Sequence, residues 1–422
     1  MNENPAVLLS PLGREALTRA AALLGDASGS ELAVAAALRR EYPASLAAAA
    51  VAQHELRLAA RGKFSRAMEM LFTRAGYEQS SSETIARHRA TRFGGARRIA
   101  DLCCGIGGDL IALAAVQRPA ATVLAVDRDE IHARLAIHNA GVYGAADRVR
   151  ACVADVRDIG LDGVDAVFID PARRAGTRRF PAGVSQPPLD WCLALAGRVP
   201  AVCVKAAPGL PAELIPPGWE AEFIADGRDL KEAVLWSPAF ATAPRRATIL
   251  PAGDTLISAP GEHGGHADPV DVGEPGEYLL DPSPAVTRAG LVEDLARLLG
   301  ARKIDPRIAF LTADREVTTP FARTLRVVES APWNEKRFAA LLRELGVGAA
   351  DIRRRGLAGD VDQIRRRLKL SGPHRATVVL TRVNDKPWGL ICTDPGAPLA
   401  NDPHSAPSTD LDQPLNASSY HF

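Results

Sequence analysis

At 422 residues the chain is longer than one ordinary domain, so we expect two or three domains. Hydrophobic residues make up 47% of it, enough for real cores, but the formal net charge of +1 excludes a chain that is basic throughout. The six cysteines show neither a C-x-x-C pair nor metal-ligand spacing, no apolar run reaches about 18 residues, and the N-terminus lacks the apolar core of a signal peptide. We therefore expect a cytoplasmic protein with free thiols, no metal and no membrane segment.

The N-terminal residues are rich in alanine and leucine at helical spacing, as in ELAVAAALRREY and SLAAAAVAQHELRLAARG. This periodicity predicts a helical bundle over residues 1–62. The pattern changes after it, and residues 63–250 are expected to form the catalytic fold.

A glycine-rich turn follows the first predicted strand of that fold, in the stretch RIADLCCGIGGDLIAL at 98–113. The apolar run ends at Asp101, the turn contains Gly105 and Gly107, and a helical pattern begins near Asp109. A strand, a tight loop and a helix in this order present backbone N–H groups to a nucleotide-like ligand. The residue where a dinucleotide-binding loop would have its third glycine is a leucine, which favours S-adenosylmethionine over NAD.

Acidic residues end the next three apolar runs: TVLAVD at Asp127, RVRACVADV near Asp155 and GVDAVFID at Asp170. Near-continuous apolar runs separated by helical segments indicate parallel strands covered on both faces. Ligands of such sheets bind beyond the carboxyl ends of the strands. We therefore expect an α/β, Rossmann-like fold, mostly a parallel sheet with helices on both faces, whose site these carboxylates surround. The later strands are expected at AVCVKAA, AEFIADG, EAVLWS and RRATIL.

Three stretches carry a family resemblance: DLCCGIGGD at 101–109, AVDRD at 125–129 and AIHNAGVYGAADRV at 136–149. Residues 98–174, roughly a fifth of the chain, resemble class I S-adenosylmethionine-dependent methyltransferases, and among them the trimethylguanosine synthase-type RNA guanine-N2 methyltransferases. The resemblance implies S-adenosyl-L-methionine as the cofactor. It assigns the first acid and the glycines to the methionine and ribose end, the second acid to the ribose hydroxyls and the third to the adenine amino group, roles that suit carboxylate acceptors. The cofactor-binding candidates are Asp101, Cys103, Gly105, Gly107, Asp127, Arg128, Asp155 and Val156.

Asp170 and Pro171 are the candidate catalytic residues, since the resemblance places them where the methyl acceptor binds. Guanine-N2 enzymes have an acid or polar residue, two prolines and a base-stacking aromatic there, whereas this chain reads DPARR at 170–174. The acid can still accept a proton from a nitrogen that is methylated. The second proline and the aromatic are absent, so the base and the atom stay open. Four arginines beside the site are predicted to contact RNA, with a solvated loop as the alternative: Arg173, Arg174, Arg178 and Arg179.

The segment before the glycine turn commonly folds over the cofactor in methyltransferases. The candidates for such a lid are Phe72, Thr73, Arg74, Glu78 and Gln79.

Beyond the catalytic fold, residues 251–276 are predicted to be a linker, 277–396 an α+β domain and 397–422 a disordered tail. Domain order and the stretches YLLDPSPAVTRAGL and SAPWNEKRFAALLRELG make residues 277–396 similar to a THUMP-like domain. Between residues 351 and 386 there are ten Lys or Arg and four acids. This excess predicts an RNA-binding surface that includes Arg353, Arg354, Arg365 and Arg366, with a solvated basic helix as the alternative.

The sequence thus predicts a methyltransferase that acts on a nitrogen of a base in structured RNA, tRNA or rRNA. Two alternatives stay open: a methyltransferase of proteins or small molecules, and a non-catalytic RNA-binding protein that has kept the cofactor fold. The retained acids Asp127, Asp155 and Asp170 argue against the second alternative.

Overall fold

A computed structural model describes residues 4–25, 31–115, 121–172, 174–175, 178–179, 181, 183–258, 270–357, 359–397 and 399. The chain divides into two compact units. Unit 1 is Met1–Ile224 with Glu232–Thr242, and unit 2 is Ala225–Lys231 with Ala243–Phe422. The boundaries expected at residues 62, 250, 276 and 396 stay predictions.

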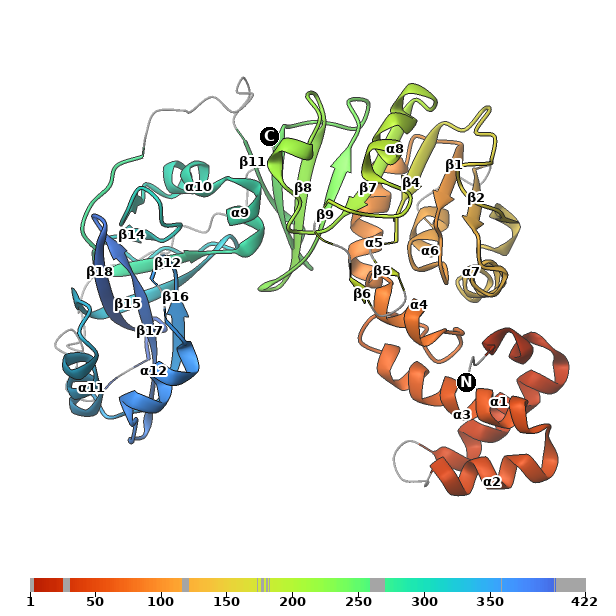
Figure 1. The fold of residues 1–422 in the computed structure, drawn as a ribbon, viewed down its shortest axis with the longest axis horizontal. Helices are drawn as coiled ribbons and strands as arrows, with labels where there is room; N and C mark the ends of the chain where they lie inside the picture. The colour runs from red at the N-terminus through yellow and green to blue at the C-terminus, as the bar shows by residue number, and fades with distance from the viewer. Residues whose placement is uncertain are drawn as a thin grey trace. The chain divides into compact units, whose positions relative to one another are not determined.

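Unit 1 begins with short helices (Figure 1). Their buried side chains share one core with side chains from the helices of the sheet. Ser10 starts α1 by accepting a hydrogen bond from the Gly13 N–H at 3.0 Å. Leu8 and Leu38 belong to the same buried cluster as Phe72. The predicted N-terminal helical region is confirmed, and it comprises η1 (Pro5–Leu9), α1 (Pro11–Leu24), α2 (Glu31–Glu41) and α3 (Ala44–Ala60).

The sheet of unit 1 confirms the predicted α/β fold. Its strands lie in the order β8-β9-β7-β4-β1-β2-β3. β3, β2, β1, β4 and β7 run parallel, and β9 is antiparallel to β7. These strands are β1 (Arg98–Leu102), β2 (Thr122–Asp127), β3 (Val149–Val153), β4 (Ala166–Ile169), β7 (Ala201–Ala206), β8 (Glu220–Asp226) and β9 (Asp229–Trp236).

Helices and a hairpin complete unit 1. β5 (Arg174–Ala175) and β6 (Arg178–Arg179) form an antiparallel pair between β4 and β7 in the chain. The helices are α4 (Arg74–Gln79), α5 (Glu83–Ala90), η2 (Thr91–Phe93), α6 (Gly108–Ala115), α7 (Glu130–Val142), η3 (Ala146–Arg148), α8 (Leu189–Ala194), η4 (Leu195–Gly197) and η5 (Ala212–Leu214). Among the described helices of the whole chain, none is long and apolar enough to cross a membrane.

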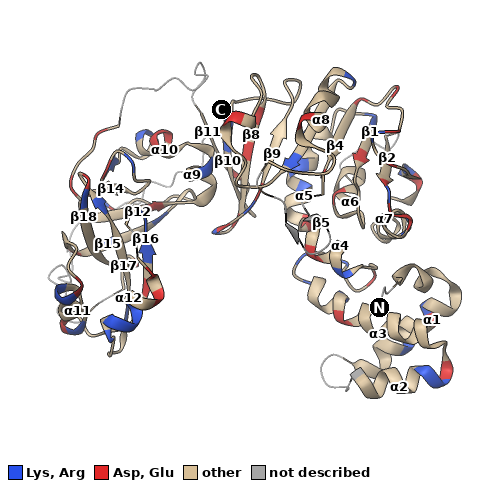
Figure 2. Ribbon diagram, in the orientation of Figure 1, with Lys and Arg blue, Asp and Glu red and all other residues tan. Residues whose placement is uncertain are grey.

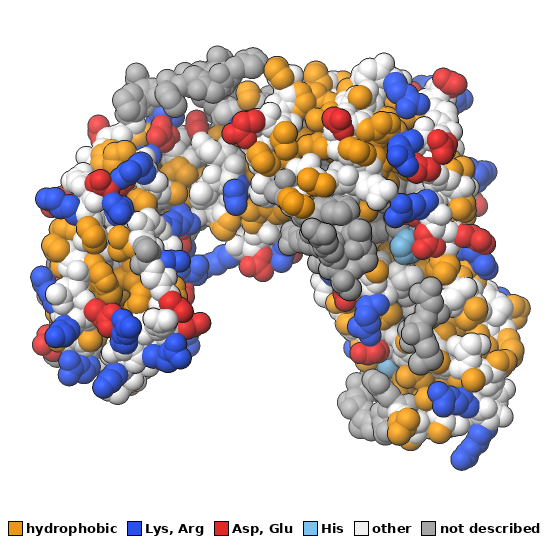
Figure 3. All heavy atoms as spheres, in the orientation of Figure 1, with side chains coloured by type: hydrophobic (Ala, Val, Ile, Leu, Met, Phe, Trp, Pro, Cys, Tyr) orange, Lys and Arg blue, Asp and Glu red, His pale blue; other side chains and the backbone are white. Residues whose placement is uncertain are grey.

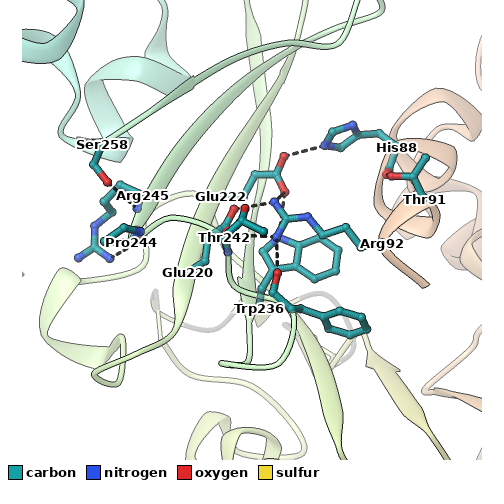
Figure 4. Close-up of polar contacts among 11 residues, drawn as sticks. His88, Thr91, Arg92, Glu220, Glu222, Trp236, Thr242, Pro244, Arg245 and Ser258 are labelled. Carbon is teal, nitrogen blue, oxygen red and sulfur yellow. Dashed lines mark hydrogen bonds and ion pairs between the residues drawn. The ribbon is translucent and has the colours of Figure 1, made fainter. Parts of the chain in front are cut away.

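Two buried ion-pair clusters hold α5 and η2 on the sheet. Arg89, 1% exposed, pairs with Asp109 on α6 and with Glu232 on β9. Arg92 pairs with Glu220 at 2.6 Å, and its guanidinium carbon lies 4.3 Å from the Trp236 ring centre (Figure 4). Buried carboxylates and guanidinium groups need such partners, because each alone would lose its hydration without compensation.

The cluster around Arg92 also includes Glu222, which is fully buried on β8. Its Oε1 lies 2.6 Å from His88 Nε2, and its Oε2 accepts a hydrogen bond from Trp236 Nε1 at 2.8 Å (Figure 4). These contacts fix the position of the segment that precedes the glycine turn.

Unit 2 confirms the predicted C-terminal α+β fold. Its main sheet has the order β13-β14-β12-β15-β18-β17-β16, antiparallel except between β16 and β17. Phe338 and Leu342 of α11 and Leu368 of α12 pack with sheet residues in one core cluster. The strands are β12 (Tyr278–Pro282), β13 (Arg302–Lys303), β14 (Leu311–Ala313), β15 (Ala322–Pro332), β16 (Val347–Arg354), β17 (His374–Val383) and β18 (Lys386–Thr393), and the helices are α9 (Pro284–Ala289), α10 (Val292–Leu299), α11 (Glu335–Glu344) and α12 (Val361–Leu368).

An antiparallel pair, β10 (Arg245–Leu250) and β11 (Asp254–Ile257), also belongs to unit 2. β11 lies within the range 251–276 that was expected to be a linker, because the residues after the 251–253 turn pair with β10. Of the tail expected at 397–422, only residues 397 and 399 lie among the described residues.

Candidate active site

The glycine turn between β1 and α6 depends on backbone conformations that suit glycine. Gly105 and Gly107 have φ angles of 54° and 86°. A side chain on Gly107 would place its Cβ 3.0 Å from the Cα of Ala136 on α7. The close approach of this turn to α7 therefore requires glycine at that position.

A cavity of about 420 Å³ lies over this turn and the carboxyl ends of the parallel strands. That volume suits a small-molecule site. It is lined by most of the residues that the sequence predicts for the cofactor and the reaction: Asp101, Cys103, Gly105, Asp127, Arg128, Asp155, Val156, Asp170 and Pro171. Gly107 does not line the cavity, since it faces α7.

Asp101 is an unusual carboxylate within this wall. Its side chain is fully buried, and no group in the described chain donates a hydrogen bond to either of its oxygens. Burial, followed by the negative charges of Asp109, Asp170 and Asp127, raises its pKa well above the ordinary value. A buried, unpartnered carboxylate that lines a cavity fits a ligand that brings a cationic donor.

Asp127, at the end of β2, supports the glycine turn directly. Its Oδ2 accepts a hydrogen bond from the Gly105 N–H, and its Oδ1 accepts one from the Asp129 N–H, both at 2.9 Å. Burial favours its neutral form, but the nearby imidazole of His132 and the hydrogen bonds from these two N–H groups outweigh burial and lower the pKa of Asp127. The carboxylate therefore stays an acceptor at the cavity wall.

His132 of α7 also lines the cavity and was not predicted from the sequence. Its Nδ1 lies 3.9 Å from Asp127 Oδ1, and its Nε2 lies 3.2 Å from the hydroxyl of Thr73. Burial disfavours the imidazolium, but the attraction of the nearby Asp127 carboxylate exceeds that effect, so the pKa of His132 is raised. The spacing Asp127-x₄-His132 was the available signal.

Asp155 follows β3 and forms a bidentate pair with Arg157, at 2.9 and 2.6 Å. Hydrogen bonds from the Arg157 side chain and backbone lower the pKa of Asp155 to about 2. Asp155 therefore remains an ionised acceptor at the cavity wall.

Asp170 stands at the end of β4 and has a partner that the sequence did not reveal. Lys205 Nζ lies 2.6 Å from Asp170 Oδ2. The lysine is 3% exposed and belongs to β7. Its only signal in the sequence was a charged residue inside the apolar run AVCVKA.

The predicted lid residues divide between the core and the cavity. Glu78 and Gln79 of α4 line the cavity, whereas Phe72 is fully buried. Thr73 caps α4 by accepting from the Gly76 N–H, and Lys63 donates to the Tyr77 carbonyl at 2.7 Å near the end of this helix.

The predicted arginines near Asp170 are only partly described. Arg173 lies outside the described residues. The backbones of Arg174, Arg178 and Arg179 form β5 and β6, but their side chains lie outside the description. Ala172 and Gln186 exchange backbone hydrogen bonds at 2.9 Å, so they close the base of this loop.

The predicted arginines of unit 2 are all exposed on β16 and α12. Arg353 pairs with Asp351 at 3.0 Å, and Arg365 pairs with Asp362 at 3.0 Å. The guanidinium of Arg354 donates to the Leu357 carbonyl. Within the described chain no cluster of three His, Cys, Asp or Glu side chains is arranged to hold a metal ion.

Three family profiles match separate parts of the chain. Residues 96–180 match the RNA cap guanine-N2 methyltransferase family, residues 322–394 match the THUMP domain-like family, and residues 3–60 match a domain of unknown function. The first match covers β1 to β6 and therefore most of the cavity wall.

Relatives that match most of the chain agree with these profiles. Two strains of Mycobacterium tuberculosis have an uncharacterized S-adenosylmethionine-dependent methyltransferase that is 38% identical over 325 residues, covering 75% of this chain and 85% of the relative. A crystal structure of a putative methyltransferase from Porphyromonas gingivalis W83 has the same fold, with a TM-score of 0.72 and 20% identity over 93% of this chain and 98% of that one.

Proposed function

The chain belongs to the family of S-adenosylmethionine-dependent methyltransferases, and on that premise we propose that it methylates a nitrogen atom of a base in structured RNA, tRNA or rRNA. S-Adenosylmethionine is its cofactor. The observation that carries the proposal is that a chain with an RNA guanine-N2 methyltransferase-type site also has a THUMP-like unit. An enzyme with such substrates is expected in the cytoplasm.

The residues of the cavity suit the cofactor. We assign the buried carboxylate of Asp101 to the ammonium group of the methionine part, Asp127 to the ribose hydroxyls and Asp155 to the adenine amino group. Each assignment pairs an acceptor oxygen with a donor of the ligand. The cofactor supplies an activated methyl group on a sulfonium.

Asp170 provides the acceptor that methylation of nitrogen requires. Its Oδ2 is held by Lys205, and Oδ1 remains for an N–H of the substrate. When bound, S-adenosylmethionine would supply its methyl group to the lone pair of the substrate nitrogen and would leave as the neutral thioether. The proton released from nitrogen passes to Oδ1 and then to water. Alignment of the nitrogen in line with the C–S bond is the main task of the protein.

The arginines of unit 2 support RNA as the partner. Lys and Arg gather on α11 and α12 (Figures 2 and 3), and α12 has Arg365, Arg366 and Arg367 in its last turn. Their pairing with exposed acids is weak, since surface ion pairs contribute about 0–1 kcal/mol. These guanidinium groups are therefore able to exchange a carboxylate for a phosphate.

Modified-nucleoside mass spectrometry of tRNA and rRNA from cells with and without the gene tests the proposal. One methylated nucleoside is expected to disappear on deletion and to return with the wild-type gene, but not with Asp170→Asn. A variant with Asp158→Asn, an exposed acid outside the cavity, is the control and should restore it. An unchanged nucleoside profile, together with methyl transfer to the protein or small-molecule fraction of the same cells, would refute RNA as the substrate.

A second experiment tests the basic surface. Reversal of Arg365 and Arg366 to Glu should weaken RNA binding and flatten its dependence on salt, by about one unit of the log–log slope for each phosphate that is no longer neutralised. Arg19→Glu on α1, an equally exposed arginine of unit 1, is the matched control. Equal effects of the two changes would contradict the assignment of RNA binding to unit 2.

A further inference from the structure

We propose that Lys205 is a positioning residue for methyl transfer, which holds the carboxylate of Asp170 so that one oxygen faces the methyl acceptor. The inference rests on the proposed role of Asp170. The new element is Lys205 on β7, whose side chain contacts Asp170 and does not line the cavity.

The strand register brings the two residues together. β4 and β7 run parallel, and Ile169 pairs with Val204. Asp170, directly after β4, and Lys205, in β7, therefore follow this pair side by side at the carboxyl edge where the cavity lies. Their 2.6 Å contact follows from the sheet and needs no flexible loop.

Burial separates the two roles. Asp170 lines the cavity and its side chain is 24% exposed, whereas Lys205 does not line the cavity and is 3% exposed. Lys205 can therefore act on a substrate only through its neighbour. A buried ammonium group without a counter-ion would be strongly unfavourable, so the pair persists whether or not a substrate is bound.

Asp170 is held both at its backbone and at one oxygen of its side chain. The backbone N–H of Asp170 donates to the Leu102 carbonyl at 3.2 Å, and Oδ2 accepts from the ammonium. A carboxylate held by one oxygen loses most of its rotation, so Oδ1 has a defined direction. A misplacement of about 1 Å in a reacting pair lowers a rate by about 10²-fold.

This support has a specific use in this chain. The run Asp170-Pro171-Ala172 lacks the second proline and the aromatic that guanine-N2 enzymes have after their acid. The ammonium group of Lys205 holds the Asp170 carboxylate from the side away from the cavity. It thereby supplies rigidity that residues 170–172 do not provide themselves.

A double-mutant cycle between Lys205 and Asp170 tests the proposal. The full-length protein is assayed in single turnovers with labelled S-adenosylmethionine and RNA from cells that lack the gene. Lys205→Met should lower the rate by about 10²-fold, while the cofactor dissociation constant stays within about twofold of wild type. Lys205→Arg, which keeps a cation, should recover part of the rate, and Lys205→Met should have no further effect in an Asp170→Asn background.

The control is Lys231→Met on β9, which removes a lysine paired with Asp229 at the surface and should leave the rate unchanged. A full additional loss from Lys205→Met in the Asp170→Asn background would overturn the proposal. So would a wild-type rate in Lys205→Met itself.

A measurement that needs no methyl acceptor tests the Lys205–Asp170 ion pair directly. It applies whatever the substrate is, and also when a variant folds too poorly for the activity assay. The ¹⁵N-detected ammonium signal of Lys205 should be resolved in the wild-type protein and should move or vanish in Asp170→Asn. An unaffected signal would overturn the ion pair and with it the proposal. If the wild-type protein methylates the protein or small-molecule fraction and not RNA, the proposed function fails, and the same cycle on that fraction still decides the role of Lys205.

Discussion

The buried carboxylate of Asp101 leads to a prediction in which stability and cofactor binding change in opposite directions. The substitution is Asp101→Asn, which removes the charge and keeps the size of the side chain. In the folded protein the carboxylate has no hydrogen-bond donor within the described chain and has three acids near it. We expect the variant to be more stable than wild type without the cofactor, and to bind the cofactor less tightly.

The magnitude follows from burial and linkage. An unsatisfied buried polar group costs about 1–3 kcal/mol, and more when it is charged. Because the pKa of Asp101 is raised in the folded state, the stability contributed by its neutral form is complete below about pH 4 and is lost as the pH rises, at up to about 1.4 kcal/mol per pH unit. Asparagine does not titrate, so the advantage of the variant should increase from about pH 4 upward.

Thermal unfolding between pH 5 and 8, with and without S-adenosylmethionine, measures both effects. Each kcal/mol corresponds to about 2–4 °C for a unit of this size. Without cofactor, Asp101→Asn should melt higher than wild type, and saturating cofactor should stabilise wild type more. The matched control is Asp109→Asn, which removes one partner of the buried Arg89 and should destabilise by about 2 kcal/mol, less than the loss of a sole partner because Glu232 remains.

Two outcomes would refute this reasoning. One is an Asp101→Asn variant that is less stable than wild type at every pH in the absence of cofactor. The other is a stability difference that does not change with pH, since a carboxylate with a raised pKa must produce such a change.

Three further predictions concern the neighbouring groups. Asp127→Ala should weaken cofactor binding in calorimetry by about 10- to 100-fold, the effect of removing a hydrogen bond to a charged group, whereas Asp158→Ala, outside the cavity, should not. The pKa of His132 is raised in the folded state, so His132→Gln should destabilise the protein at pH 6 in urea unfolding and progressively less as the pH rises through that raised pKa; a pH-independent loss would contradict the pairing. Gly107→Ala should destabilise by about 2 kcal/mol or more because of its φ of 86° and the α7 backbone 3.0 Å away, and Gly144→Ala, with φ of 72° but open space, should destabilise less.

The sequence was most informative where a signal is local. The apolar runs that end in Asp127 and Asp170 predicted strands of a parallel sheet, and both acids lie at strand ends over one cavity. Within a single segment, strand periodicity, a glycine turn and a helix start are encoded by adjacent residues, so no knowledge of the rest of the chain is needed.

The sequence was less informative about what surrounds those acids. The structure places Gly107 against α7, and its assignment to the cofactor stays a prediction. The sequence did not reveal His132 beside Asp127, because the spacing Asp127-x₄-His132 does not by itself show that the helix turns the imidazole toward the end of β2.

By itself, then, the sequence determined the α/β fold, the strands that build its sheet and the acids that the resemblance assigns to S-adenosylmethionine. Only the tertiary structure decided that β7 lies beside β4 and so sets Lys205 against Asp170, which is 35 residues away in the chain. It also decided that Asp101 is buried without a donor while Asp109 has Arg89. The physical reason is that periodicity reports which face of a strand is buried, whereas the partner of a buried charge depends on which strands and helices become neighbours.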